Sequence, residues 1–148
     1  MVDNLDNKIL SILQKNGRTK RNELAEAVGL SLPSVSERLK KLEERGIIEG
    51  YYAKLNRNAF GFDIMAYILV IMESSKHYKD LIHKVEKIPE ITECHSVLGE
   101  GSHMLKAVVK NTEALEKLLG EIQSWVGVIS TKTTFVLSTI KETTVLNI

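Results

Sequence analysis

An unbroken run of nine apolar residues, Ile64 to Met72, most constrains how this chain can fold. A helix needs about 20 such residues to cross a bilayer, so the run is too short to be a membrane span. A strand with one face in water alternates apolar and polar residues, whereas a strand covered on both sides is apolar throughout. The run therefore predicts a central strand with a layer against each face.

The chain after this strand alternates between helical and extended patterns. The expected elements, in order, are a strand over 64–73, a helix from Tyr78 to Ile88, a strand over 91–98, a turn over 99–102, a strand over 103–109, a helix capped by Asn111 or Thr112, and a strand over 128–140. This βαββαβ order is the ferredoxin-like arrangement. Its helices cover one sheet face, and a second copy of the chain is the economical cover for the other, which predicts a homodimer. The alternative cover, residues 143–148 folding back, is too small for a four-stranded sheet.

The first 57 residues predict three short helices. The first follows Asp3 or Asn4 and ends at Asn16-Gly17, and the second runs from about Lys20 to Val28. A third begins after Ser31, with Pro33 in its first turn, and ends at Gly46. Extended residues after Gly46, at 47–48 and 51–55, predict a strand pair, or wing, and residues 56–61 predict a hinge.

The third helix presents two different stripes of side chains. The inward stripe comprises Leu32, Val35, Leu39 and Leu42, and the outward stripe comprises Ser34, Glu37, Arg38, Lys41 and Arg45. A helix, a tight turn and a second helix form the helix-turn-helix motif, whose second helix enters the major groove of DNA. The alternative is a solvated basic face on a small helical bundle.

The net charge of +1 conceals an uneven distribution. Residues 1–57 hold 11 Lys and Arg against 8 Asp and Glu, whereas residues 58–148 hold 9 against 11. All five arginines, whose planar donors suit phosphates and guanine edges, lie in the first part. Unless this clustering is chance, it indicates that the first part binds nucleic acid.

Patterns that support catalysis, a cofactor or a metal site are missing from the sequence. It contains no phosphate-binding GxxxxGK[ST] motif, and Gly99-x-Gly101 is too little for a dinucleotide fingerprint. Cys94 and His95 are adjacent on an expected strand, so they point to opposite faces and cannot hold one ion. The single cysteine and the absence of a signal-peptide pattern predict a cytoplasmic protein.

Several motifs resemble the leucine-responsive regulatory protein/AsnC (Lrp/AsnC) family of transcription regulators. They are Leu5-Asp6-x-x-Ile9-Leu10, Asn16-Gly17-Arg18, Glu23-Leu24-Ala25, Val28-Gly29-Leu30-Ser31, Arg38-Leu39 with Leu42 and Gly46, Gly50-Tyr51, Leu55-Asn56, Glu93-Cys94-His95 and Leu118-Leu119-Gly120. The resemblance implies an α+β protein that is no enzyme. It has a winged helix-turn-helix DNA-binding domain (1–55), a hinge (56–61) and a ferredoxin-like ligand-binding and oligomerisation domain of the RAM type (62–148).

The resemblance also implies partners: double-stranded DNA, further copies of the chain in dimers and often octamers, and an amino-acid effector in a cleft between dimers. The effector positions it implies are Gly99, Gly101, Ser102, His103, Thr131, Thr133 and Val136. The family's turn usually runs Gly-x-aromatic-Asp-aromatic, whereas here it is Gly99-Glu100-Gly101-Ser102-His103. This departure predicts either a different effector or a cleft that serves assembly alone.

The expected DNA contacts fall into two groups. Phosphate contacts are assigned to Lys20, Arg21, Ser31 and Lys54, and base-edge contacts to Ser34, Glu37, Arg38 and Lys41. Arg38 has a second interpretation, a structural ion pair with Glu23 or Glu26. Two other functions remain as alternatives. One is a small-molecule-binding assembly module with vestigial DNA binding. The other is an enzyme that decarboxylates tetrapyrroles, as some relatives of the family do.

Overall fold

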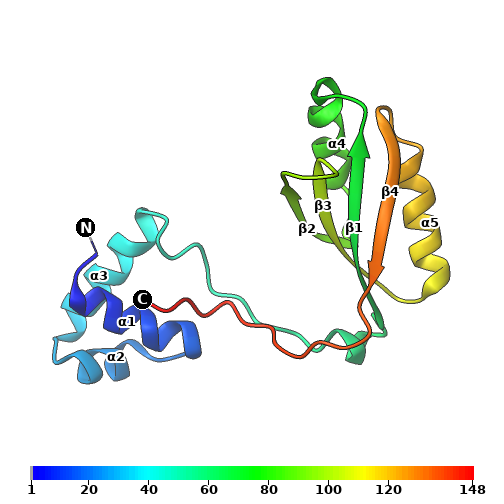
Figure 1. The fold of residues 1–148 in the computed structure, drawn as a ribbon. Helices are drawn as coiled ribbons and strands as arrows, with labels where there is room; N and C mark the ends of the chain where they lie inside the picture. Colours follow the sequence, from blue (N-terminus) through cyan, green and yellow to red (C-terminus); the bar gives the residue numbers. More distant parts are fainter. Residues whose placement is uncertain (1) are drawn as a thin grey trace. The chain divides into compact units, whose positions relative to one another are not determined.

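The chain folds into two compact units in a computed structural model that describes residues 2–148 (Figure 1). The helical unit comprises residues 2–54 together with Lys141–Ile148, and the sheet unit comprises Leu55–Ile140. The sequence placed the last eight residues in the second domain, but in the structure they pack with the first. The chain therefore passes between the units twice.

Three helices form the body of the helical unit, and two of them, the first and the third, begin at a residue whose side chain caps the helix. They are α1 (Asn4–Lys15), α2 (Arg21–Val28) and α3 (Leu32–Glu44). Asp3 caps α1 by accepting from the backbone N–H groups of Leu5 and Asp6, and the Asp6 carboxylate accepts from the Asp3 N–H in return. Ser31 caps α3, and Gly29 ends α2 with a φ of 69°, which glycine adopts without strain.

The core of the helical unit is small. It consists of Ile9, Leu24, Ala25, Val35 and Leu39. The predicted inward stripe of α3 is thus correct for Val35 and Leu39, and Leu42 is buried as well. Leu32 departs from the prediction, because it is the first residue of the helix and remains 49% exposed.

The wing predicted after α3 does not form as a strand pair in the described chain. Residues 47–56 contain no strand, although Tyr51 is held to α3 by a hydrogen bond from its hydroxyl to Glu43 Oε1 (3.0 Å). Burial and this bond raise the pKa of Tyr51 to about 12. The predicted pair would join a strand of two residues (47–48) to one of five (51–55). So short a pair forms too few hydrogen bonds between its strands to be stable by itself.

The sheet unit has the predicted βαββαβ order. After a short 3₁₀ turn (η1, Arg57–Phe60), its elements are β1 (Ile64–Met72), η2 (Ser75–His77), α4 (Tyr78–Val85), β2 (Ile91–Ser96), β3 (His103–Val109), α5 (Thr112–Gln123) and β4 (Val128–Phe135). The antiparallel strands lie in the order β2-β3-β1-β4. The last strand ends at Phe135 rather than Ile140. Phe135 pairs with Ala66, and β1 begins only two residues before Ala66, so most of residues 136–140 have no strand beside them.

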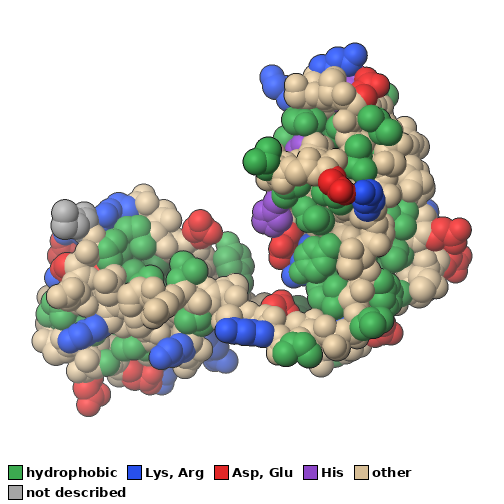
Figure 2. All heavy atoms as spheres, in the orientation of Figure 1, with side chains coloured by type: hydrophobic (Ala, Val, Ile, Leu, Met, Phe, Trp, Pro, Cys, Tyr) green, Lys and Arg blue, Asp and Glu red, His purple; other side chains and the backbone are tan. Residues whose placement is uncertain are grey.

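The two faces of the sheet have different surroundings. Ala66, Ile68 and Val70 of β1 pack with β3 residues against α4 and α5, and they form the main core. Met65, Tyr67 and Leu69 alternate with them and point to the opposite face, which no helix of the sheet unit covers. Hydrophobic side chains gather along the strands in Figure 2.

Candidate nucleic-acid interface and effector turn

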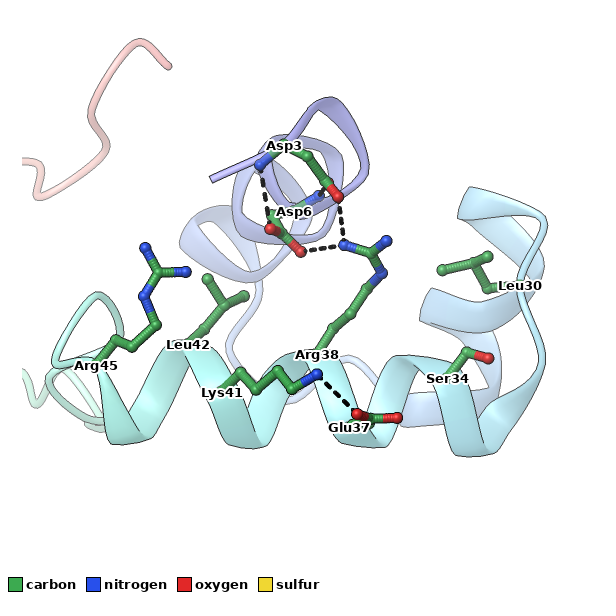
Figure 3. Close-up of a pocket in the computed structure, with 9 residues that line it drawn as sticks. All are labelled: Asp3, Asp6, Leu30, Ser34, Glu37, Arg38, Lys41, Leu42 and Arg45. Carbon is green, nitrogen blue, oxygen red and sulfur yellow. Dashed lines mark hydrogen bonds and ion pairs between the residues drawn. The ribbon is translucent and has the colours of Figure 1, made fainter. Parts of the chain in front are cut away.

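The outward face of α3 borders a shallow depression of about 410 Å³ in the helical unit (Figure 3). Four predicted base-edge residues lie together on its wall: Ser34, Glu37, Arg38 and Lys41. Arg45 of the same stripe also lines it, and Asp3 and Asp6 reach it from the start of α1. The structure thus brings the polar side chains of α3 to one surface, next to the N-terminus of α1.

Arg38 joins α3 to α1. Its Nη1 lies 2.7 Å from Asp3 Oδ2 and 2.7 Å from Asp6 Oδ1. Only 10% of the Asp6 side chain is exposed, so the pair lies partly away from water. The hydrogen bonds to Asp3 and then Asp6 raise the pKa of Arg38, while the Asp6 backbone N–H and then Arg38 lower the pKa of Asp3.

The structural interpretation of Arg38 therefore holds, but with different partners from those expected. Neither Glu23 nor Glu26 pairs with it; the Glu23 carboxylate instead accepts from the backbone N–H of Lys20 (3.3 Å). Arg38 lines the depression with the other predicted base-edge residues, and its charge is used to hold two helices together.

The other polar side chains of α3 are paired more loosely. Lys41 Nζ lies 2.7 Å from Glu37 Oε1, one helical turn away, and both side chains are more than 60% exposed. The bond to Lys41 lowers the pKa of Glu37. Ser34 Oγ shares a hydrogen bond of 2.8 Å with the capping Ser31 hydroxyl. Water-exposed pairs of this kind contribute little to stability, so these groups can exchange their partners for DNA.

The predicted phosphate contacts all lie in the helical unit, whose Lys and Arg side chains are visible in Figure 2. Lys20 and Arg21 are exposed at the start of α2, where a helix N-terminus also favours anions. The Ser31 hydroxyl is used as the cap of α3. Lys54 Nζ lies 3.4 Å from Glu142 of the C-terminal segment.

Two of the predicted effector residues are enclosed within the sheet unit. Ser102 and His103 are buried, with Ser102 Oγ 2.9 Å from His103 Nδ1. The His103 ring packs edge-on against Tyr78 of α4, with their centroids 4.8 Å apart, and burial lowers its pKa. His103 faces the helices because it shares the inward alternation of Leu105, Ala107 and Val109. Contact of these two side chains with an effector stays a prediction.

The remaining predicted effector positions are dispersed. A Cβ on Gly101 would lie 2.6 Å from the Leu69 side chain and 2.9 Å from the Val70 carbonyl oxygen, so glycine lets the turn approach β1. Gly99 has a φ of 140°. Thr131 accepts a hydrogen bond from Gln123 of α5, whereas Thr133 is exposed and Val136 is half-buried.

The sequence analysis missed an ion pair beside this turn. Lys132 Nζ lies 2.5 Å from Glu100 Oε2, and Lys132 lowers the pKa of Glu100. Lys132 pairs with Leu69 in the sheet register, so it lies on the open face, opposite to Thr131 and Thr133. Strand alternation can place Lys132 on the open face once the inward residues of the strand are known. Nothing in the sequence, however, links Lys132 to Glu100.

Metal-ligating clusters and membrane-spanning helices are both missing from the described part of the chain. Among residues 2–148, no group of three or more His, Cys, Asp or Glu side chains is placed to hold a metal ion. No helix in that range is long and apolar enough to cross a membrane. Cys94 packs on the sheet core and its burial raises its pKa, while His95 is exposed beside Glu93, so the two point apart as predicted.

Comparison with protein families matches both units. Residues 2–49 match the winged helix-turn-helix DNA-binding model, and residues 65–146 match the Lrp/AsnC ligand binding domain. The chain belongs to the Lrp/AsnC family. The predicted family, α+β fold class and regulatory function are thereby confirmed: this Lrp/AsnC chain is a transcription regulator with a DNA-binding and a ligand-binding domain.

Individual relatives extend the similarity over the whole Lrp/AsnC chain. The HTH-type transcriptional regulator FL11 of Pyrococcus furiosus is 37% identical over 144 residues, covering 97% of this chain and 95% of the relative. A transcriptional regulator of Neisseria meningitidis solved in complex with L-methionine has a TM-score of 0.93 and 35% identity, covering 99% and 97%. AsnC of Escherichia coli has a TM-score of 0.91 and 32% identity, covering 98% of each chain.

Proposed function

We propose that this regulator binds double-stranded DNA with the outward face of α3, and that Arg38 positions this helix rather than contacting a base. The observation that carries the proposal is that the polar side chains of α3 differ in how firmly they are paired. Ser34, Glu37 and Lys41 are only loosely paired, whereas Arg38 is fixed to α1 by two ion pairs. A helix anchored in this way presents its polar side chains at a constant angle to a groove.

The loosely paired side chains have donor and acceptor groups that suit base edges. A lysine donates to O6 and N7 of guanine, and a carboxylate accepts from N4 of cytosine. Lys41 and Glu37 therefore fit the two members of a G·C pair, or neighbouring pairs. Phosphate contacts fall to Lys20, Arg21, Ser31 and Lys54, which fix the position on the duplex without selecting a sequence.

The experiment that tests this proposal compares two neighbouring lysines. Lys41→Ala removes a lysine from the outward face, whereas Lys40→Ala removes one that is turned about 100° away on the same helix. Binding to DNA fragments selected with the purified protein is measured by fluorescence anisotropy. We expect Lys41→Ala to weaken specific binding by about 1–3 kcal/mol. Lys40→Ala should leave it nearly unchanged.

The outcomes separate the possible roles of α3. An equal loss on selected and unrelated sequences would make Lys41 a phosphate contact. No binding by the unaltered protein, even at low ionic strength, would reject DNA binding through this face.

We further propose that the open sheet face assembles two copies into a dimer, and that dimers associate into octamers. Tyr67 and Leu69 on this face remain in contact with solvent in the single chain. A two-fold dimer requires a pseudo-palindromic site, with half-sites about 10 bp or a multiple of this apart. The selected fragments should contain such inverted repeats, and single unpaired sites would contradict the dimer.

A zwitterionic effector, such as an α-amino acid, fits the Glu100–Lys132 pair. The Glu100 carboxylate lies in the turn for an ammonium group, and the Lys132 ammonium lies on β4 for a carboxylate. The Neisseria meningitidis relative with bound L-methionine supports this class of ligand.

Thermal denaturation in the presence of single amino acids tests this site, with L-methionine first. An effector at 100 times its Kd adds about 2.7 kcal/mol to the free energy of unfolding. Glu100→Gln should abolish this gain, while Glu116→Gln, an exposed carboxylate on α5, should retain it. No stabilisation by any amino acid would leave assembly as the role of this turn.

The relatives are named transcriptional regulators, which supports a role without catalysis. We propose that the protein acts in the cytoplasm. Relatives come from organisms without a nucleus, such as Pyrococcus furiosus and Escherichia coli, and the single, half-buried cysteine suits reducing conditions.

A further inference from the structure

The C-terminal segment, Lys141–Ile148, lies against the helical unit although it contains no helix or strand. Gln14 of α1 holds it through both backbone polar groups of one residue, Leu146. Gln14 Nε2 donates to the Leu146 carbonyl oxygen (3.1 Å), and the Leu146 N–H donates to Gln14 Oε1 (2.6 Å). These two hydrogen bonds resemble the pair that two residues exchange between antiparallel strands. They involve only the backbone of Leu146, so they do not depend on its side chain.

A second contact ties the same segment to a cation of the helical unit. Glu142 Oε2 lies 3.4 Å from Lys54 Nζ, and both side chains are at least half exposed. Under the proposed function, Lys54 contacts a DNA phosphate. The Glu142 carboxylate neutralises part of the Lys54 charge and repels an approaching phosphate, so the two anions compete for this ammonium.

We propose that the C-terminal segment is autoinhibitory: while Gln14 holds it on α1, Glu142 occupies Lys54 and competes with DNA for that cation. This inference rests on the proposed function and adds a form of regulation to it. DNA binding and docking of the segment are then mutually unfavourable, and each weakens the other by the same factor.

The docking is weak enough to be reversed. Val145, Leu146 and Ile148 remain 42%, 69% and 52% exposed, so little apolar surface holds the segment in place. Its covalent connection through residues 136–140 compensates, since a short flexible link gives a docked segment an effective concentration in the millimolar range. A contact that forms readily but is held by few bonds is suited to displacement by a polyanion.

The test uses the full chain and four variants made from three substitutions. Glu142→Gln removes the competing charge, and Gln14→Ala releases the segment without changing any charge. The double variant combines the two changes. Glu116→Gln is the control, because it removes an exposed carboxylate of the sheet unit. DNA affinity is measured by anisotropy at constant salt, and docking by hydrogen exchange of the Leu146 amide.

We expect Glu142→Gln and Gln14→Ala each to tighten DNA binding by about two- to fivefold, the range for one exposed ion pair. In the Gln14→Ala background, Glu142→Gln should add little, because the segment has already been released. The Leu146 amide should be protected in the unaltered protein and unprotected in Gln14→Ala. Glu116→Gln should leave both measurements unchanged.

Other results separate the inference from the proposed function. Unchanged affinity of both single variants, with the unaltered protein still binding DNA, would overturn autoinhibition and leave the proposed function intact. Weaker binding by Gln14→Ala would also overturn it, because the segment would then support the DNA-binding unit. Absence of DNA binding in every variant and in the unaltered protein would overturn both.

Discussion

The helical unit and the sheet unit are held together by different means. Among the described residues, fourteen apolar side chains are buried in the sheet unit, whereas six are buried in the helical unit. The helical unit adds polar contacts at its helix ends, with Asp3 and Asp6 serving both as a cap and as partners of Arg38. Charged residues of the smaller unit thus maintain the fold beside a surface proposed to bind DNA, while the larger unit depends mainly on apolar packing.

The largest effect should come from a cavity in the sheet unit. Ile68→Ala removes a fully buried side chain and should lower the free energy of unfolding of this unit by about 2–5 kcal/mol. Trp125, the single tryptophan, is buried in the same unit and reports its unfolding in urea by fluorescence. Ile9→Ala in the helical unit is the matched control and should leave the Trp125 transition unchanged. An equal shift with both variants would show that the units unfold together.

A smaller effect is expected when the polar connection of the helical unit is cut. Arg38→Ala leaves Asp6, nearly buried, without a positive partner, and should destabilise this unit by about 1–3 kcal/mol. Loss of helical circular dichroism in urea measures it. Arg21→Ala, at an exposed arginine of the same unit, should change stability by no more than about 0.5 kcal/mol. Similar losses for both variants would contradict a structural role specific to Arg38.

The smallest effect is a change in the pH dependence of stability, and it comes from His103, the buried histidine of β3. Burial lowers the pKa of His103, so below its ordinary value of 6.5 the unfolded chain takes up a proton while the native side chain stays neutral. Stability is therefore complete above pH 6.5 and declines as the pH falls toward the lowered pKa. His103→Gln should lose less stability than the unaltered protein between pH 7.5 and 5.5. His83→Gln, at an exposed position on α4, should behave like the unaltered protein.

Local signals were sufficient to predict most of the elements. Ser31 and Gly46 bracket α3, and Asn111 begins α5, because a cap or a positive φ acts within one turn of the chain. The succession of helical and extended patterns predicted the βαββαβ order, and that order is typical of the ferredoxin-like sheet. Strand alternation in β3 also indicates that His103 faces inward with Leu105.

Contacts that depend on how elements pack could not be predicted. Arg38 is 35 residues from Asp3, and they meet only after α1 packs beside α3. The periodicity of α3 defines the face on which Arg38 lies but not what approaches that face. The early end of β4 and the docking of Glu142 on Lys54 depend in the same way on distant segments.

The double use of Asp3 and Asp6 has a consequence for engineering. Replacing the whole of α3 with that of another regulator, in order to change the DNA sequence recognised, could replace Arg38. Asp3 and Asp6 at the start of α1 would then lose their positive partner. Exchanging only Ser34, Glu37 and Lys41 would keep the joint between the helices intact. These three positions form a cassette, and a library restricted to them should yield folded variants with altered target sequences far more often than one that also varies Arg38.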